Sequence, residues 1–212
     1  HFLRLQEKLK FKMVFTSSSE IYGDFSGVMR EDVPMKTPIR QLNDYALSKW
    51  VNELQILNSA DRFGTETVRL RLFNTYGPGE YYSNYRSVIC LFVYRALHKM
   101  PYTVFKKHHR TFSWIFDTAR TMANIADNFK AGEVYNISGD EFVAVKKASD
   151  MILEQLGMDD SLVEYKEVEH HNTIDKKSDN SKAKRDLKHR ETVKLKDGIA
   201  ETIKWQKKVY GV

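Results

Sequence analysis

The sequence predicts an α/β fold in which a long helix connects two strands of one parallel sheet. Residues 12–18 and 65–73 have the composition of strands, and residues 43–62 between them have the pattern of a helix. Parallel strands need a long crossover of this kind, which is usually an α-helix. With 42% hydrophobic residues in a chain of 212, there is enough apolar side-chain volume for a compact core.

The helix over residues 43–62 is predicted from its apolar spacing. Apolar residues recur along one side of it and are Ala46, Leu47, Trp50, Val51, Leu54 and Leu57. Asn43 or Asp44 is the expected N-cap, because a short polar side chain there can accept a hydrogen bond from a free backbone N–H. Gly64 is the expected stop, since glycine readily adopts the left-handed conformation that ends many helices.

The turn at residues 77–79 marks the end of the second strand, and the pattern after it is mixed. Short strands are expected over residues 102–105, 112–115, 134–137 and 163–167. Helices are expected over residues 3–10, 87–99, 117–129 and 145–156, with terminal helices after them. No internal repeat or low-complexity linker is visible.

Tyr45 and Lys49 are four residues apart on the predicted helix and therefore lie on the same face. An ammonium group beside a phenol lowers the pKa of the phenol, which makes Tyr45 a candidate general base. Tyr102 and Lys106 have the same spacing, but they lie in a short β-branched and aromatic run after Pro101. That run has the pattern of a strand, in which residues four apart are too distant for such an effect.

Several segments resemble the extended short-chain dehydrogenase/reductase family, in its nucleotide-sugar epimerase/dehydratase branch. The segments are residues 15–23 (FTSSSEIYG), 45–49 (YALSK), 71–78 (RLFNTYGP), 110–117 (RTFSWIFD), 134–139 (VYNISG) and 179–187 (DNSKAKRDL). The resemblance implies a Rossmann-like parallel sheet, here without its N-terminal strands, and a small mixed α/β substrate-binding lobe. Residues 1–79 are then the remainder of the NAD-binding domain, and residues 80–212 are mainly the lobe, interleaved with the sheet.

The resemblance also implies a glycine-rich loop that holds the cofactor pyrophosphate at a helix N-terminus. The sequence has no such loop: Gly77 and Gly79 form its only close glycine pair, and they follow the Tyr45 helix. We therefore expect the chain to be the C-terminal portion of a longer protein. On its own it is expected to bind NAD weakly or not at all, and whether it is active by itself stays open.

The resemblance assigns catalytic roles to Tyr45, Lys49 and Ser18. Tyr45 removes the proton of a sugar hydroxyl while hydride leaves the same carbon for the nicotinamide, and Ser18 holds that hydroxyl in line. Lys49 keeps the phenolate available and contacts the nicotinamide ribose. Ser17 and Phe73 are further implied cofactor contacts, and the implied cofactor is NAD rather than NADP.

Ser19 and Glu20 bear on the reaction type. Dehydratases of the family have an Asp-Glu pair at this place, in which the acid protonates the departing hydroxyl and the glutamate removes the C5 proton. Here the base position is filled by Glu20, but the acid position holds Ser19, a combination that also resembles the nucleotide-sugar uronate decarboxylases. Epimerisation, elimination, decarboxylation and simple C4 dehydrogenation all stay open, and a non-catalytic nucleotide-binding relative is the non-enzyme alternative.

The implied substrate is a nucleotide-diphosphate sugar whose base the sequence does not identify. The residues implied to bind it are Asn74, Tyr82, Arg86, Arg110 and Lys176. Asn74 would contact the diphosphate or the sugar, Arg110 the phosphates or, as in decarboxylases, the substrate carboxylate, and Lys176 the phosphates. The aromatic segment 80–86 could stack on the base or the sugar, or instead form a dimer surface or a plug in the core.

Other partners are constrained by composition. The net charge is +6, and residues 176–208 hold twelve Lys or Arg against five Asp or Glu, but these acids are interleaved and aromatic residues are scarce, so no nucleic-acid partner is expected. No apolar run reaches the ~18 residues of a membrane span. The two histidine pairs lack a ligand cluster, so no metal is expected.

The lone Cys90 favours a reducing, cytoplasmic setting. The family resemblance implies a homodimer that pairs through the Tyr45 helix.

Overall fold

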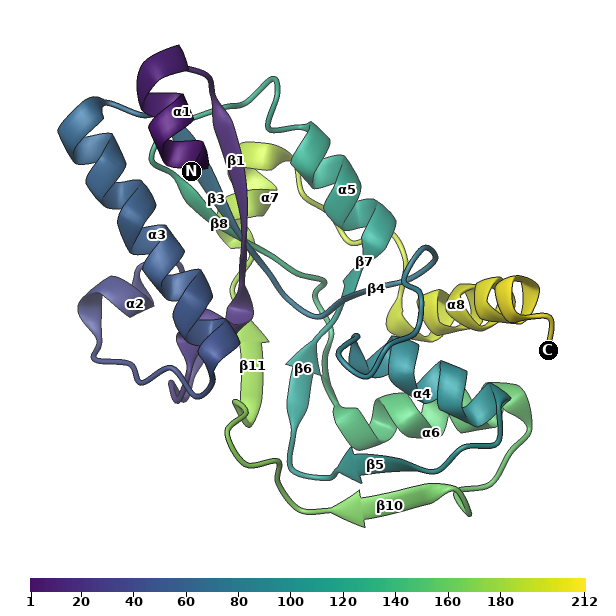
Figure 1. The fold of residues 1–212 in the computed structure, drawn as a ribbon. Coiled ribbons are helices and arrows are strands. Elements are labelled where there is room, and N and C mark those ends of the chain that lie inside the picture. Colours follow the sequence, from purple (N-terminus) through teal and green to yellow (C-terminus); the bar gives the residue numbers. More distant parts are fainter.

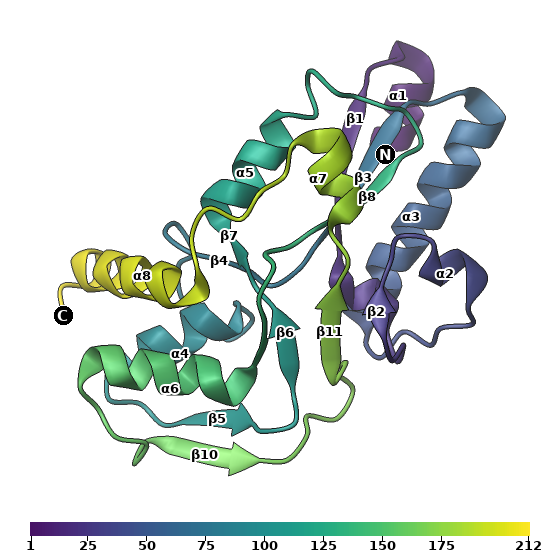
Figure 2. The same ribbon diagram turned by 180° about the vertical axis from the view of Figure 1, so that it is seen from behind.

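A computed structural model describes all residues from 1 to 212, and it confirms the predicted α/β class with parallel strands. The main sheet has the order β1-β3-β8, and all its pairings are parallel. Its strands are β1 (Met13–Ser18), β3 (Thr67–Leu72) and β8 (Val134–Ile137). Helices α1 (Phe2–Leu9) and α3 (Asp44–Phe63) lie on one side of the sheet, and α7 (Ser181–Leu187) lies on the other (Figures 1 and 2).

Helix α3 begins and ends as its sequence predicts. The Asn43 side chain is the N-cap and accepts a hydrogen bond of 2.8 Å from the backbone N–H of Ala46. Gly64 ends the helix in the left-handed conformation, with φ of 63°. The cap fixes the first turn of α3, which carries Tyr45.

The second half of the molecule is built from three helices and a two-stranded sheet. The helices are α4 (Val88–Leu97), α6 (Val145–Leu156) and α8 (Leu195–Tyr210), and the parallel strands are β5 (Tyr102–Phe105) and β10 (Val163–Lys166). They enclose a core of 16 buried residues, among them Ile89, Val104 and Ile152. The strand at Tyr102 confirms that the second tyrosine-lysine pair is not helical.

Two predicted elements have different bounds. The strand expected over residues 112–115 is two short strands, β6 (His109–Thr111) and β7 (Ser113–Trp114), and the helix expected over residues 117–129 is α5 (Ile115–Ala123). Helix α5 starts directly after Trp114, whose extended backbone is its N-cap, so the strand cannot continue to residue 115.

Several short elements were not predicted from the sequence. They are η1 (Ser19–Tyr22), β2 (Val28–Met29), α2 (Val33–Lys36), β4 (Thr75–Tyr76), β9 (Phe142–Ala144) and β11 (Asp175–Ser178). Strand β11 is polar, but it pairs with β2 on one side and with β6 on the other. It thereby joins the half that carries the main sheet to the half that carries α4, α6 and α8.

None of the helices combines the length and the apolar character needed to cross a membrane.

Candidate functional site

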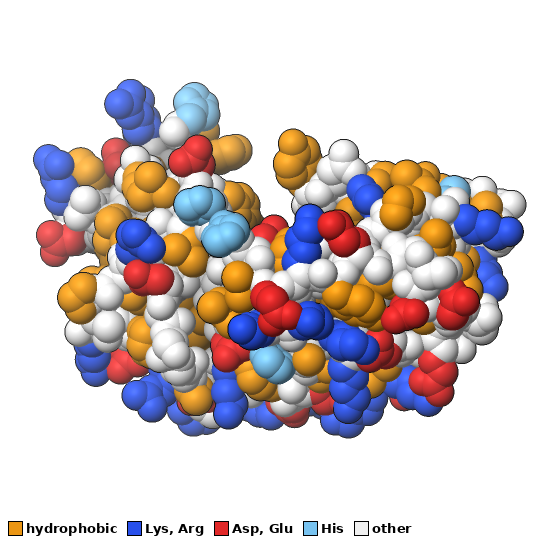
Figure 3. All heavy atoms as spheres, turned by 90° about the horizontal axis from the view of Figure 1, so that it is seen from below, with side chains coloured by type: hydrophobic (Ala, Val, Ile, Leu, Met, Phe, Trp, Pro, Cys, Tyr) orange, Lys and Arg blue, Asp and Glu red, His pale blue; other side chains and the backbone are white.

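A cavity of about 910 Å³ lies between the two halves of the molecule. It lies where β1 and β3 end, because Ser17, Ser18 and Leu72 are among the residues that line it. A space-filling view from the side of β10 shows a hollow between the two halves (Figure 3). Ligands of open parallel sheets usually bind at this edge, beyond the carboxyl ends of the strands.

Most of the predicted site residues come together in this cavity. Those that line it are Ser17, Ser18, Ser19, Glu20, Tyr45, Lys49, Asn74, Arg86, Arg110 and Lys176. Phe73 and Tyr82 are not among its lining residues. Phe73 is buried against Tyr22, and the ring of Tyr82 stacks on Tyr94 at a centroid distance of 3.7 Å, so the contacts predicted for these two residues are not supported by their placement.

Tyr45 and Lys49 lie one turn apart on α3, on the side that faces the cavity. The Lys49 Nζ atom is 5.7 Å from the centroid of the Tyr45 ring and donates a 2.8 Å hydrogen bond to the backbone oxygen of Thr16. Partial burial lowers the pKa of Lys49, because burial disfavours its charged form. The Tyr45 side chain stays 54% exposed, so its phenol is accessible to a ligand.

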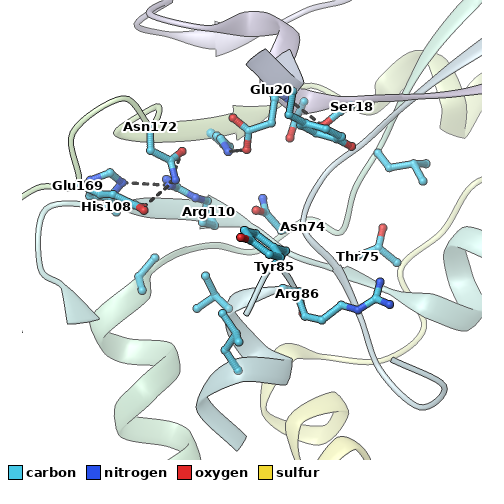
Figure 4. Close-up of a pocket in the computed structure, with 18 of the residues that line it drawn as sticks. Ser18, Glu20, Asn74, Thr75, Tyr85, Arg86, His108, Arg110, Glu169 and Asn172 are labelled. Atoms are coloured by element: carbon cyan, nitrogen blue, oxygen red, sulfur yellow. Dashed lines mark hydrogen bonds and ion pairs between the residues drawn. The ribbon is translucent and has the colours of Figure 1, made fainter. Parts of the chain in front are cut away.

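Ser18 and Glu20 reach the cavity from the end of β1. The Ser18 Oγ atom accepts a 3.2 Å hydrogen bond from the backbone N–H of Glu20 and so caps η1. The hydroxyl proton of Ser18 has no acceptor in the protein and is free to bind a ligand oxygen. Figure 4 shows Ser18 and Glu20 on the same wall.

Glu20 forms an ion pair with Lys176 of β11. Lys176 is only 2% exposed, and burial lowers its pKa to about 8 in spite of the Glu20 charge, which acts in the opposite direction. This ion pair links the turn after β1 to β11, the strand that joins the two halves. It places a carboxylate and an ammonium group at the cavity wall.

Arg110 and His108 also line the cavity (Figure 4), and Arg110 of β6 is the strand partner of Lys176 of β11. The Arg110 guanidinium donates to the backbone oxygens of His109 and Ile174, at 2.9 and 2.7 Å, and contacts the Nδ1 atom of His108 at 2.9 Å. Burial, together with the Arg110 charge, lowers the pKa of His108 to about 4. The imidazole is therefore neutral at physiological pH.

A buried network behind the cavity was missed by sequence reasoning. Glu53 of α3 accepts hydrogen bonds from Arg71, at 2.8 and 3.0 Å, and from the Ser17 hydroxyl, at 2.5 Å. Arg69 lies 3.4 Å from the same carboxylate. Burial alone would raise the pKa of Glu53, but the hydrogen bonds from Arg71 hold it below its ordinary value.

The sequence does contain a signal for this network. Arg69 and Arg71 alternate with apolar residues in a strand that is otherwise predicted to be buried, and Glu53 lies one turn after Lys49. Two charges on one face of a buried strand require a partner of opposite charge. In this network the Ser17 hydroxyl already donates its hydrogen bond to the Glu53 carboxylate.

Comparisons with known proteins identify the family of the chain. Residues 2–138 match the model of the NAD dependent epimerase/dehydratase family. The chain belongs to this family. The resemblance predicted from the motifs is thereby confirmed.

Relatives of this chain carry the names of different enzymes. It is 28% identical over 200 residues to the dTDP-glucose 4,6-dehydratase of Streptomyces griseus, covering 92% of this chain and 58% of that protein. It is 25% identical over 205 residues to the UDP-glucuronic acid decarboxylase 1 of Arabidopsis thaliana, covering 95% of this chain and 46% of that protein. The chain thus spans about half the length of these relatives.

A solved structure shows the same fold. The UDP-glucuronic acid 4-epimerase of Bacillus cereus, in complex with UDP-glucuronic acid and NAD, superposes with a TM-score of 0.86 at 25% identity. The match covers 98% of this chain and 65% of that structure.

The cavity carries a net positive charge. Its charged lining residues are four cations, Lys49, Arg86, Arg110 and Lys176, and two carboxylates, Glu20 and Glu169. A low-dielectric cleft with an excess of one charge attracts ligands of the opposite charge. The cavity is therefore suited to an anionic ligand.

Proposed function

We propose that the protein is an NAD-dependent enzyme that modifies a nucleotide-diphosphate sugar and begins by oxidising C4 of the sugar. The observation that carries this proposal is the convergence of Ser18, Tyr45 and Lys49 on one cavity. At about 910 Å³, the cavity is within the range of ligand sites. Its net positive charge is complementary to a diphosphate.

The residues present fit the nicotinamide end of the cofactor. Tyr45 is exposed to the cavity, and Lys49 has its ammonium group at the free edge of β1, where only Thr16 accepts a hydrogen bond from it. When bound, NAD supplies the acceptor for the hydride that leaves C4. Lys49 would hold the nicotinamide ribose, and we propose NAD rather than NADP as the cofactor.

Tyr45 is the proposed general base. Its phenolate takes the proton of the 4-hydroxyl, and the nearby Lys49 ammonium stabilises the phenolate. The free hydroxyl proton of Ser18 binds the same sugar oxygen and holds it in line with Tyr45. The product of this step is a 4-keto sugar.

Glu20 is the proposed base of the next step. A carbonyl at C4 acidifies the adjacent C–H groups, and the Glu20 carboxylate, held by Lys176, can remove such a proton. Return of the proton with inversion gives an epimer, whereas departure of a neighbouring hydroxyl gives an elimination product. Ser19 beside Glu20 would assist proton transfer to the leaving group.

The diphosphate is proposed to lie against Asn74, Arg110 and Lys176. Asn74 is held by a 3.0 Å hydrogen bond from its Nδ2 atom to the Thr111 backbone oxygen, which leaves its Oδ1 atom free. Lys176 and Arg110 are paired residues of the neighbouring strands β11 and β6 and supply positive charge, and the Arg110 guanidinium is held by protein carbonyls. These contacts would orient the sugar toward Ser18 and Tyr45.

Decarboxylation of a nucleotide-linked uronic acid is the second candidate. It is favoured by the presence of Ser19 where a dehydratase has its acid, and by the Lys176 ammonium beside Glu20. A cation at this place can bind a substrate carboxylate at C6. Oxidation at C4 makes that acid a β-keto acid, which loses carbon dioxide.

A homodimer is proposed through α3. Leu47, Val51 and Leu54 lie on the outer side of this helix and are each more than one third exposed. Their spacing forms an apolar stripe, which a second copy of the helix would cover. A cytoplasmic location stays a prediction.

The proposed function is tested by incubating the full-length protein that contains this chain with NAD and a panel of sugar nucleotides, and by measuring nicotinamide absorbance and product mass. Unchanged mass with altered stereochemistry indicates epimerisation. Loss of water, of carbon dioxide or of two hydrogens indicates elimination, decarboxylation or dehydrogenation. Absence of any product with every sugar nucleotide would refute the proposal.

A further inference from the structure

Arg110 differs from the other buried cations of the protein in having no carboxylate partner. The buried lysine and arginine residues are Arg69, Arg71, Arg110 and Lys176. Arg69 and Arg71 pair with Glu53, and Lys176 pairs with Glu20. Arg110 forms no salt bridge, although it is only 4% exposed. Buried charges in proteins are normally paired, so this exception needs an explanation.

The partners of the Arg110 guanidinium are all neutral groups. One of its terminal nitrogens, Nη1, donates to the backbone oxygens of His109 and Ile174. The other, Nη2, lies 2.9 Å from the Nδ1 atom of His108 and 3.4 Å from the Oδ1 atom of Asn172. Both terminal nitrogens are therefore held in place, and none of these contacts neutralises the charge of the guanidinium.

The nearby carboxylates do not pair with Arg110. Three of them act on it from a distance, and each has a closer partner: Glu20 has Lys176, Glu169 has Asn172 and Asp175 has His109. Burial lowers the pKa of Arg110 and outweighs the charges of these carboxylates, which act in the opposite direction. The cavity wall therefore contains a buried cation whose charge is available to an anionic ligand.

His108 is the side chain that lies against the Nη2 atom of Arg110 (Figure 4). It is buried at the cavity wall, and its other ring nitrogen, Nε2, lies 2.9 Å from the backbone N–H of Glu169. An N–H donor thus faces each ring nitrogen. A neutral ring can accept one of these two hydrogen bonds at a time, whereas a protonated ring, with hydrogen on both nitrogens, can accept neither. The geometry therefore favours the neutral imidazole, in agreement with the lowered pKa of His108.

A carboxylate in the place of His108 would change the charge of the cavity. The pair of Arg71 with Glu53 shows what such a partner does in this protein, where two hydrogen bonds join opposite charges that cancel. A neutral imidazole positions the Arg110 guanidinium without cancelling its charge. In a low-dielectric cleft, a charge that is not cancelled attracts an anion strongly.

We propose that His108 is a positioning residue, which holds the Arg110 guanidinium at the cavity wall as an unpaired charge for the anionic oxygens of the ligand. The inference rests on the proposed function, because the anion is either the diphosphate or a C6 carboxylate of the proposed substrate. Arg110 makes the contact with the anion, and His108 acts only through Arg110.

The test compares His108→Asn with His108→Asp in the full-length protein that contains this chain. The two new side chains have nearly the same shape and can place an oxygen near the Nη2 atom of Arg110, but only the aspartate is charged. Binding of UDP-glucose, dTDP-glucose and UDP-glucuronic acid is measured by calorimetry without added NAD. His108→Asn is expected to bind like the wild type. His108→Asp is expected to bind about tenfold or more weakly, because its carboxylate competes with the ligand anion for a charge-assisted contact.

The three ligands distinguish the two possible anions. Equal weakening of all three by His108→Asp indicates that Arg110 binds the diphosphate. Weakening confined to UDP-glucuronic acid indicates that Arg110 binds the C6 carboxylate. Either result supports the role of His108.

His109→Asp is the matched control, because it adds the same charge at the next residue, which does not line the cavity. It should leave all three affinities unchanged, and a loss equal to that of His108→Asp would overturn the proposal. His108→Gln and His108→Glu are a second matched pair, which replaces the first if thermal unfolding shows that His108→Asp does not fold.

The proposal is also overturned if His108→Asp binds as tightly as His108→Asn, if His108→Asn loses as much affinity as His108→Asp, or if the wild type binds none of the three ligands. Binding without turnover when NAD is added would refute the proposed reaction but leave the role of His108 intact.

Discussion

Arg71 donates two hydrogen bonds, 3.0 and 2.8 Å long, to the carboxylate of Glu53, and both side chains are almost completely buried. Glu53 lies on α3, the helix of Tyr45 and Lys49, and Arg71 lies on the central strand β3. The same carboxylate accepts the hydroxyl of Ser17, which precedes Ser18. The pair therefore fixes the proposed catalytic helix relative to the strand end that carries the proposed catalytic serine.

Replacing Glu53 by alanine is expected to destabilise the fold strongly. The substitution leaves the Arg71 guanidinium buried without its carboxylate, and breaking a buried pair in this way costs about 3–5 kcal/mol. The measurement is the free energy of unfolding from denaturant titration. Asp150→Ala is the control: it breaks the exposed pair with Lys146 and should cost less than about 1 kcal/mol. A loss as small as that of the control would contradict the structural role of Glu53.

Replacing Asn43 by alanine is expected to destabilise the protein by about 1 kcal/mol, the typical cost of losing an N-cap. The cap holds the turn that carries Tyr45, so the variant should also lose turnover. Thermal unfolding and initial rates measure the two effects. Asn52→Ala on the same helix is the control, because the Asn52 side chain bonds only to the Ser48 backbone oxygen at 2.8 Å. Equal stability of the two variants would argue against the cap.

Stability should rise with pH between about 8 and 9.5 because of Lys176. Its pKa is lowered to about 8 by burial, whereas an unfolded lysine titrates near pH 10.4, so the unfolded state binds more protons in this window. The gain in stability from deprotonating Lys176 is complete above the pKa of lysine in the unfolded state. It is lost as the pH falls through the lower pKa of Lys176 in the folded state.

The size of the pH-dependent change in stability caused by Lys176 can be measured by comparison with Lys176→Met, which removes this titration. The stability of the wild type relative to the variant should increase by about 1–2 kcal/mol across the window, since one pKa unit corresponds to about 1.4 kcal/mol. Denaturant unfolding at several pH values measures the difference. A difference that does not change with pH would show that the Lys176 pKa is not lowered.

Replacing Tyr45 by phenylalanine is expected to lower kcat by about 10²- to 10⁴-fold, the usual contribution of a general acid or base. The affinity for the sugar nucleotide should stay unchanged, because the phenol oxygen acts on the 4-hydroxyl during the reaction. Steady-state rates and calorimetry separate the two effects. Tyr81→Phe, outside the cavity, is the control and should retain full activity. Unchanged kcat in Tyr45→Phe would exclude Tyr45 as the base.

Much of the fold and site follows from local sequence signals. The Tyr45 helix, its cap and its glycine stop depend on residues within a few positions of one another, and the structure has them as predicted. Ten of the predicted site residues line one cavity, because they come from motifs at the ends of strands and at the start of a helix.

The remaining features depend on contacts that are distant in sequence. Strand β11, residues 175–178, has no apolar pattern and is a strand because β2 and β6 pair with it from both sides. Within the aromatic loop, Tyr82 is turned from the cavity by Tyr94 and Tyr210, which lie on helices far along the chain. Sequence spacing alone could not show that Tyr85, and not Tyr82, lines the cavity.

The central claim is that this cavity oxidises C4 of a nucleotide sugar with Tyr45 as the base. It is tested most directly with a sugar nucleotide that carries deuterium at C4, incubated with NAD and the full-length protein that contains this chain, followed by mass spectrometry of the nicotinamide. The account predicts that deuterium appears on the reduced nicotinamide or is returned to the sugar product, and that Tyr45→Phe abolishes the transfer. Retention of all the deuterium at C4 of unchanged substrate, although the sugar nucleotide binds, would contradict it.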